Sequence, residues 1–226
     1  MQLQKLTKQR QSEEKRRYDD ACGLAHAMEL VGERWAMLVM RELAYGPRRF
    51  SDLKGDLQGI SANVLSQRLN ELEARGLVRK TRLPPPASVQ VYEATQWGLE
   101  VIPVIASLGR WAARSPLHNP NLPMSHVSVI MSLQTLLSPE LSEGIRARIG
   151  FRFGQASYVT TLHDGRLDVE RRAAEDCDVT FTGAPSEVAA VIHGGAPLET
   201  IDIKGDMELA KRFTTLFPLP PTVSES

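Results

Sequence analysis

The side chains with the most distinctive chemistry lie in residues 59–80, on one side of a segment spaced by leucines. At 100° per residue the leucines share one side, which must face a core. Asn63, Gln67 and Asn70 fall on the opposite side, with Ser66 beside them. A carboxamide can donate and accept together, which matches the major-groove edge of adenine. We expect these four residues to contact DNA bases; the alternative is a neutral, solvated helix face.

Basic residues surround this segment in the chain. Arg79, Lys80 and Arg82 follow it in a hairpin-like stretch, where a wing commonly places cations against phosphates. Arg68 flanks the amide face, where it contacts phosphate or pairs with a neighbouring carboxylate. The expected phosphate contacts are Arg48, Arg49, Arg68, Lys80 and Arg82. Double-stranded DNA is therefore the expected partner.

Charge is distributed unevenly along a chain whose net charge is zero. Residues 1–115 carry 18 Lys and Arg against 13 Asp and Glu, a net of +5. Residues 116–226 carry 9 against 14, a net of −5. Such an asymmetry is expected when one half of a protein meets a polyanion, although sampling alone also produces it.

The cysteine pattern and the hydropathy indicate a cellular compartment. Cys22 and Cys177 lie far apart and form no CxxC pair, which fits a reducing cytosol. The first twenty residues are polar and charged, unlike a signal peptide. No apolar run approaches the roughly 18 residues that a membrane span needs. We therefore expect a soluble, cytoplasmic protein with no membrane partner.

Residue spacings give no positive case for an enzyme. The five histidines show no metal-ligand spacing. Neither a glycine-rich phosphate loop nor a nucleophile elbow is present. We therefore expect no catalytic site, no metal site and no cofactor.

Hydrophobic periodicity predicts two domains. Up to residue 113 the order is four helices, a hairpin with a proline-rich tip, and a helix, the layout of a mainly α winged helix-turn-helix. We expect Ser51 and Ser61 to be N-caps and Gly76 to end the fourth helix.

Beyond residue 123 the pattern changes to period two. "GIRARIGFRF" alternates apolar residues with arginines, and "HDGR" carries a hairpin-turn signal. This predicts an α+β domain with an antiparallel sheet. The expected limits are a charged arm over 1–20, a winged helix-turn-helix domain over 21–114, a linker over 115–123, an α+β domain over 124–217 and a disordered tail over 218–226.

The segment from residue 22 to residue 113 resembles the HxlR-type winged helix-turn-helix regulators, relatives of the MarR group. The resemblance rests on Gly32-x-x-Trp35, "GPRRFSDL", "GISANVLSQRLNELEARGLV" and "YEATQWG". It implies a homodimeric transcriptional regulator on a palindromic operator, with the first and last helices of the domain in the dimer contact. We expect a repressor, with activation as the alternative.

Residues 140–217 are similar to sterol-carrier-protein type 2 domains, in the Asp-Gly turn, "VTFTGAPSEVAAVIHGG" and "IKGD". The similarity implies a sensor domain for an apolar small molecule. The expected pocket residues are Phe151, Phe153, Leu162, Val179, Phe181 and Ile192. One alternative is that these side chains form an ordinary hydrophobic core with no ligand. Another is that the domain is degenerate and serves only dimer contacts. The rival function is a hydrophobic-ligand-binding module whose winged helix serves dimerisation or partner contact.

Cys22 is the candidate for a chemical sensor. The resemblance implies this role, since some family members use a cysteine at this place to sense oxidants or electrophiles. Cys22 stands near a predicted helix start, with Arg16 and Arg17 upstream, and such positive surroundings favour a reactive thiolate. The alternative is a buried, inert cysteine.

Overall fold

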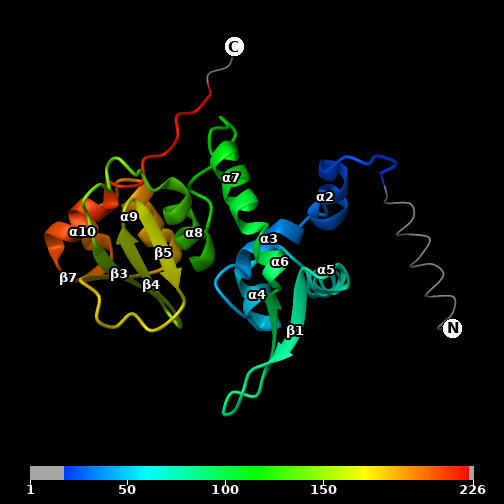
Figure 1. Ribbon diagram of the computed structural model, residues 1–226. Helices are drawn as coiled ribbons and strands as arrows, with labels where there is room; N and C mark the ends of the chain where they lie inside the picture. The colour runs from blue at the N-terminus through cyan, green and yellow to red at the C-terminus, as the bar shows by residue number, and fades with distance from the viewer. Residues whose placement is uncertain (1–17, 224–226) are drawn as a thin grey trace.

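The computed structural model describes residues 18–223 and places a helical N-terminal domain beside an α+β C-terminal domain (Figure 1). The expected arm over residues 1–20 lies outside the described residues except for its last three. The N-terminal helices are α2 (Gly23–Val31), α3 (Ala36–Glu42), α4 (Phe50–Asp56), α5 (Ala62–Ala74), α6 (Gln96–Leu99) and α7 (Ile102–Ala112). This order confirms the predicted mainly α layout.

Helix α5 begins and ends where its sequence predicts. The Ser61 side chain accepts a hydrogen bond from the backbone N of Val64 at 3.2 Å, which satisfies one of the free N–H groups at the helix start. Gly76, just beyond the helix, has a φ of +75°, a conformation that glycine adopts without strain. The leucines of α5 are fully buried and fix the orientation of the helix.

The predicted cap of α4 was wrong. The helix begins at Phe50 with Arg49 at the N-cap position, so Ser51 lies inside the first turn. The Ser51 hydroxyl donates to Asp52 Oδ1 at 3.2 Å instead of capping the backbone. Arg49 has the extended backbone of an N-cap but makes no side-chain cap hydrogen bond.

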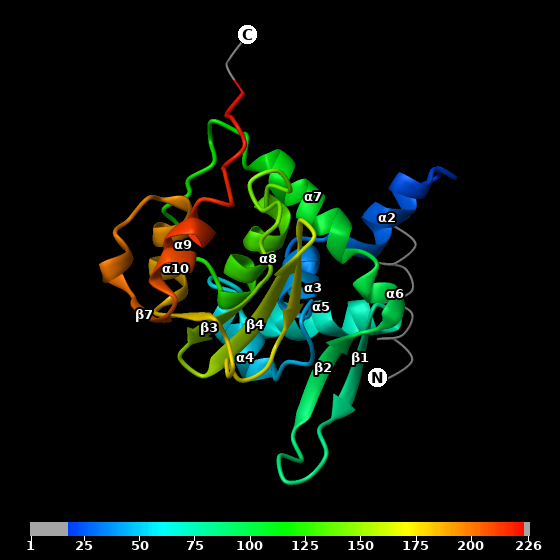
Figure 2. The same ribbon diagram turned by 60° about the vertical axis from the view of Figure 1, so that its left-hand side comes forward.

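The wing is an antiparallel hairpin of β1 (Val78–Arg82) and β2 (Gln90–Ala94), which projects away from the helices in Figures 1 and 2. Its base is tied to the helical domain through Tyr92. The backbone N and O of Arg48 exchange two hydrogen bonds with Tyr92, each 2.8 Å long. The start of α4 and the wing are therefore held in one unit.

The C-terminal domain contains a five-stranded sheet with strand order β5-β4-β3-β6-β7. Its elements are α8 (His126–Leu136), β3 (Ala147–Phe153), β4 (Ala156–His163), β5 (Arg166–Glu170), β6 (Val179–Thr182), α9 (Pro185–His193), the 3-10 helix η1 (Leu198–Thr200), β7 (Asp202–Gly205) and α10 (Met207–Thr214). The α+β prediction is confirmed.

The sheet is not wholly antiparallel, because β3 and β6 pair in parallel. Residues 171–178 leave the edge strand β5 and cross to the far side of β3, so β6 runs in the same direction as β3. Periodicity predicted the strands but carries no information on this crossover.

One face of the sheet is covered by α8, α9 and α10 and forms the main core of this domain (Figure 2). The other face of β3 is crossed by the connection 171–178. A Cβ atom on Gly150 would lie 2.9 Å from Ala174 Cβ and 3.1 Å from Cys177 Sγ, which is why β3 has a glycine there.

The chain after α10 runs back to the end of α7. The backbone N of Val223 donates to the Arg114 carbonyl at 2.9 Å, and Arg114 Nε donates to the Pro221 carbonyl at 3.2 Å. These two hydrogen bonds hold Pro221 and Val223 at the end of α7, within the segment 218–226 for which the sequence predicts a disordered tail. Residues 224–226 lie outside the described residues.

Candidate nucleic-acid interface

The predicted base-reading face of α5 is exposed. Asn63, Ser66, Gln67 and Asn70 are all exposed, while the leucines on the opposite side are buried. The Gln67 amide donates from Nε2 to Glu71 Oε1 at 3.0 Å, within the same helix. A base edge could replace that hydrogen bond without moving the backbone.

Three of the predicted phosphate contacts are exposed. Arg49 lies at the start of α4, and Lys80 and Arg82 lie on β1. The Lys80 ammonium lies 5.4 Å from the centre of the Tyr92 ring, a cation–π distance. Arg82 donates from Nε to the Ser88 carbonyl at 2.9 Å, which holds its guanidinium along the wing. The wing cations and the amide face of α5 come from neighbouring elements (Figure 1).

The other two predicted phosphate contacts, Arg48 and Arg68, need correction because both are buried. Arg48 is 3 % exposed and pairs with Asp56, and its Nη1 lies 3.8 Å from Glu42 Oε2. Arg68 is 5 % exposed and pairs with Glu71 and, at 3.6 Å, with Glu33. Both guanidinium groups pair with carboxylates inside the domain. For Arg68 this is the alternative that the sequence left open, whereas nothing in the sequence indicated it for Arg48.

The six residues expected to line an apolar pocket are buried in the core of the C-terminal domain. The Phe151 ring stacks on Phe181 with centroids 5.5 Å apart and on Phe153 at 6.1 Å. Leu162, Val179 and Ile192 belong to the same core cluster. In this conformation the side chains pack against one another, as the plain-core alternative expects.

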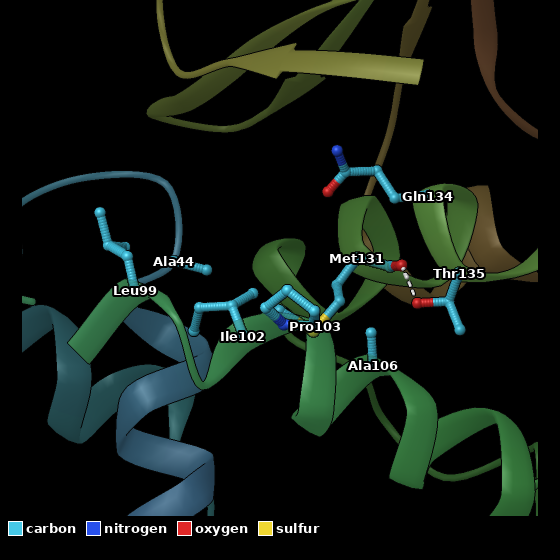
Figure 3. Close-up of a pocket in the computed structure, with 8 residues that line it drawn as sticks. All are labelled: Ala44, Leu99, Ile102, Pro103, Ala106, Met131, Gln134 and Thr135. Atoms are coloured by element: carbon cyan, nitrogen blue, oxygen red, sulfur yellow. Dashed lines mark hydrogen bonds between the residues drawn. The ribbon is translucent and has the colours of Figure 1, made fainter. Parts of the chain in front are cut away.

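A hollow of about 440 Å³ lies elsewhere, at the junction of the two domains (Figure 3). Its walls come from α6 and α7 on one side and α8 on the other. The lining residues are Ala44, Leu99, Ile102, Pro103, Ala106, Met131, Gln134 and Thr135. None of the six predicted pocket residues lines this hollow.

Cys22 is exposed and stands at the N-cap position of α2. Its backbone N donates to Asp20 Oδ1 at 2.9 Å. In the single chain the thiol is therefore not buried, and its role as a chemical sensor stays a prediction. The arginines at positions 16 and 17 lie outside the described residues.

Within residues 18–223 no three His, Cys, Asp or Glu side chains are grouped so that they could hold a metal ion. No helix in the same range has the length and hydropathy to cross a bilayer.

A set of buried and half-buried polar side chains at the domain junction was not indicated by any sequence pattern. Asp56 at the end of α4 lies 3.4 Å from His126 Nε2, and His126 Nδ1 lies 2.6 Å from the Tyr158 hydroxyl. Asp56 and His126 are 70 positions apart in the chain, and His126 and Tyr158 are 32 positions apart. The three residues lie on different elements, so only the tertiary structure brings them together.

Comparison with protein families divides the chain as the fold does. Residues 30–118 match the HxlR-like helix-turn-helix model. Residues 130–218 match the SCP-2 sterol transfer family model. The first match ends in the connection between α7 and α8, and the second begins within α8.

Relatives of the first domain are HTH-type transcriptional regulators by name. The HTH-type transcriptional regulator YvaP of Bacillus subtilis is 33 % identical over 38 % of this chain and 80 % of its own length. YkvN of the same organism is 38 % identical over 40 % of this chain and 77 % of its own length. The structure of reduced YodB from B. subtilis is 29 % identical, covers 43 % of this chain and 97 % of that chain, and superposes with a TM-score of 0.39. This chain belongs to the HxlR-like helix-turn-helix family of transcriptional regulators.

Proposed function

We propose that the protein acts as a homodimeric repressor that reads double-stranded DNA with α5 in the major groove and holds the backbone with its wing. The observation that carries this proposal is the exposed face of α5, where amides and a serine replace the Glu and Lys usual on a solvated helix. Asn63, Ser66, Gln67 and Asn70 contact bases. Arg49, Lys80 and Arg82 contact phosphates.

Exposed apolar side chains on α2 and α7 support the dimer. Leu24 is 68 % exposed, and on α7 Val104 is 53 % and Trp111 73 % exposed. None of the residues of α7 is buried, although most of them are apolar. A second copy covering these helices would remove that surface from water. The twofold axis would then set half-sites about one helical turn, roughly 10 bp, or a multiple apart.

An apolar small molecule is the proposed effector of the C-terminal domain. The match to the SCP-2 sterol transfer family supports this role. In the described conformation the aromatic core is closely packed, so an effector would enter by displacing side chains such as Phe151 and Phe153.

The test is operator binding by a Gln67→Ala variant of the full-length protein. DNA selected by the wild-type protein from a randomised pool serves as the probe. We expect Gln67→Ala to weaken binding by about 1–3 kcal/mol and to relax the sequence preference at one base pair, because a bidentate base contact is lost. Fluorescence anisotropy titration at fixed salt measures both.

Gln96→Ala is the matched control, since it removes the same exposed amide from α6. It should bind like the wild type. An unchanged sequence preference in Gln67→Ala would refute the assignment of the α5 face to base reading.

A further inference from the structure

Residues of the C-terminal domain contact the helix-turn-helix unit at a cluster of buried and half-buried polar side chains. We call Glu42, Arg48, Asp56 and His126 the hub. Glu42 and Arg48 are 1 % and 3 % exposed, and His126, from the C-terminal domain, is 8 % exposed. Buried charges of this kind are costly unless they are paired, so the hub holds its members in fixed positions.

The N-terminal half of the hub links every element that the proposed function assigns to DNA. Arg48 pairs with Glu42 on α3 and with Asp56 on α4, and its backbone is hydrogen-bonded to Tyr92 at the base of the wing. Asp56 is the last residue of α4 and stands five positions before Ser61, the cap of α5. Arg48 therefore contacts the wing directly, and Asp56 is joined to the cap of α5 by residues 57–60.

Three contacts from the C-terminal domain reach the hub or the residue next to it. Ser125, the cap of α8, donates from Oγ to Glu42 Oε1 at 2.7 Å. Arg171 donates from Nη1 to the Pro47 carbonyl at 3.3 Å, next to Arg48. The third contact is the chain that runs from Tyr158 through His126 to Asp56.

The imidazole of His126 can serve both neighbours at once. When Tyr158 donates its hydroxyl proton to Nδ1, the neutral ring carries its own proton on Nε2 and donates it toward Asp56. Burial raises the pKa of the Asp56 carboxyl, but hydrogen bonds from His126 and Arg48 outweigh it and leave the pKa below its usual value. Asp56 is thus held as a carboxylate between the two domains.

The same histidine touches the aromatic core of the C-terminal domain. Its ring is stacked on Phe153 with centroids 6.3 Å apart, and Phe153 is stacked on Phe151 at 6.1 Å. A molecule that displaced these rings would move His126 and loosen its contact with Asp56. The contacts are continuous from the proposed effector domain to the turn before α5.

From these contacts we propose that the C-terminal domain fixes α5 and the wing in their DNA-binding positions through the hub, with His126 as the positioning residue. Without this contact the turn before α5 is more mobile. Ordering the turn then costs part of the free energy of DNA binding, so the affinity for DNA falls. The expected effect of His126 on DNA binding rests on the proposed function. The expected effect of His126 on the turn before α5 does not.

The experiment compares His126→Leu with His126→Gln in the full-length protein. Leucine removes the donor to Asp56, whereas the glutamine amide can place a nitrogen near the position of Nε2. Hydrogen exchange of the backbone amides of residues 57–61 measures the turn, and binding to the selected DNA measures the function. We expect His126→Leu to exchange faster at 57–61 and to bind DNA at least about fivefold more weakly, the lower end of usual coupling between sites. His126→Gln should restore both.

Tyr45→Phe is the matched control at the same junction. Phenylalanine keeps the ring that packs edge-on against Tyr158, with centroids 5.9 Å apart, and removes only the hydroxyl, which donates to Gln134 Oε1 on α8 at 2.5 Å. Its loss should leave exchange at 57–61 and DNA binding unchanged. If His126→Leu fails to fold, Tyr158→Phe, which removes only the hydroxyl that orients the imidazole, takes its place.

Two results would overturn the inference. Unchanged exchange at residues 57–61 in His126→Leu would show that the contact does not position the turn. Tighter DNA binding by that variant would show that the hub holds α5 away from DNA. If the wild-type protein selects no DNA from the randomised pool, the proposed function fails. The exchange measurement still decides whether His126 positions the turn.

Discussion

At the scale of single residues, His193 couples the stability of the C-terminal domain to pH. Its Nε2 lies 2.8 Å from Ser132 Oγ, and its ring packs edge-on against Phe217 with centroids 6.4 Å apart. Burial lowers the pKa of His193 below its usual value of 6.5. The folded state therefore disfavours the charged imidazole that the unfolded chain accepts.

The free energy of unfolding should fall as the pH drops below about 6.5, because the unfolded state binds the proton first. Because glutamine does not titrate, we expect the free energy of unfolding of His193→Gln to fall less between neutral and acid pH than that of the wild type. Urea unfolding at pH 5 and pH 8 measures the difference for each variant.

The control at this scale is His163→Gln. Hydrogen bonds that the imidazole donates to Asp168 and to Asp164 raise the pKa of the half-buried His163, so its contribution to stability has the opposite sign and is lost as the pH rises. His163→Gln should therefore keep the loss of stability on the acid side. If His193→Gln lost as much free energy of unfolding between pH 8 and pH 5 as the wild type, the role of His193 would be contradicted.

At the scale of elements, α5 owes its start to one hydroxyl. Ser61→Ala removes the acceptor for Val64 N and should lower the free energy of unfolding by about 1 kcal/mol, as for other N-cap serines. Ser51→Ala makes the same chemical change inside α4, where the serine caps nothing, and should stay within about 0.5 kcal/mol of the wild type. Chemical denaturation of both variants makes the comparison; equal effects would mean that the Ser61 cap does not stabilise α5.

At the scale of the whole molecule, α7 presents its apolar residues to solvent. Trp111→Glu places a charge where the proposed dimer buries a 73 % exposed indole, so it should convert the dimer into a monomer at micromolar concentration. Sedimentation velocity measures the mass.

Leu117→Glu is the control for that variant, because Leu117 is 92 % exposed and lies beyond the end of α7. It should remain dimeric. A Trp111→Glu protein that stays dimeric would place the twofold contact on another surface.

The sequence by itself determined the elements that local pattern controls. The leucine spacing of α5 fixed which side faces the core, and Ser61 and Gly76 fixed its two ends, because caps and periodicity act within a few residues. The same local signals predicted the wing and the Asp164-Gly165 hairpin turn.

Tertiary structure alone decided which charges are available. Arg48 and Arg49 are neighbours in the chain, yet Arg48 is buried against Asp56 while Arg49 is exposed. Burial and pairing depend on partners from other elements, and a charge in the sequence carries no record of them. The parallel pairing of β3 with β6 and the contact of His126 with Asp56 were likewise decided by packing between segments far apart in the chain.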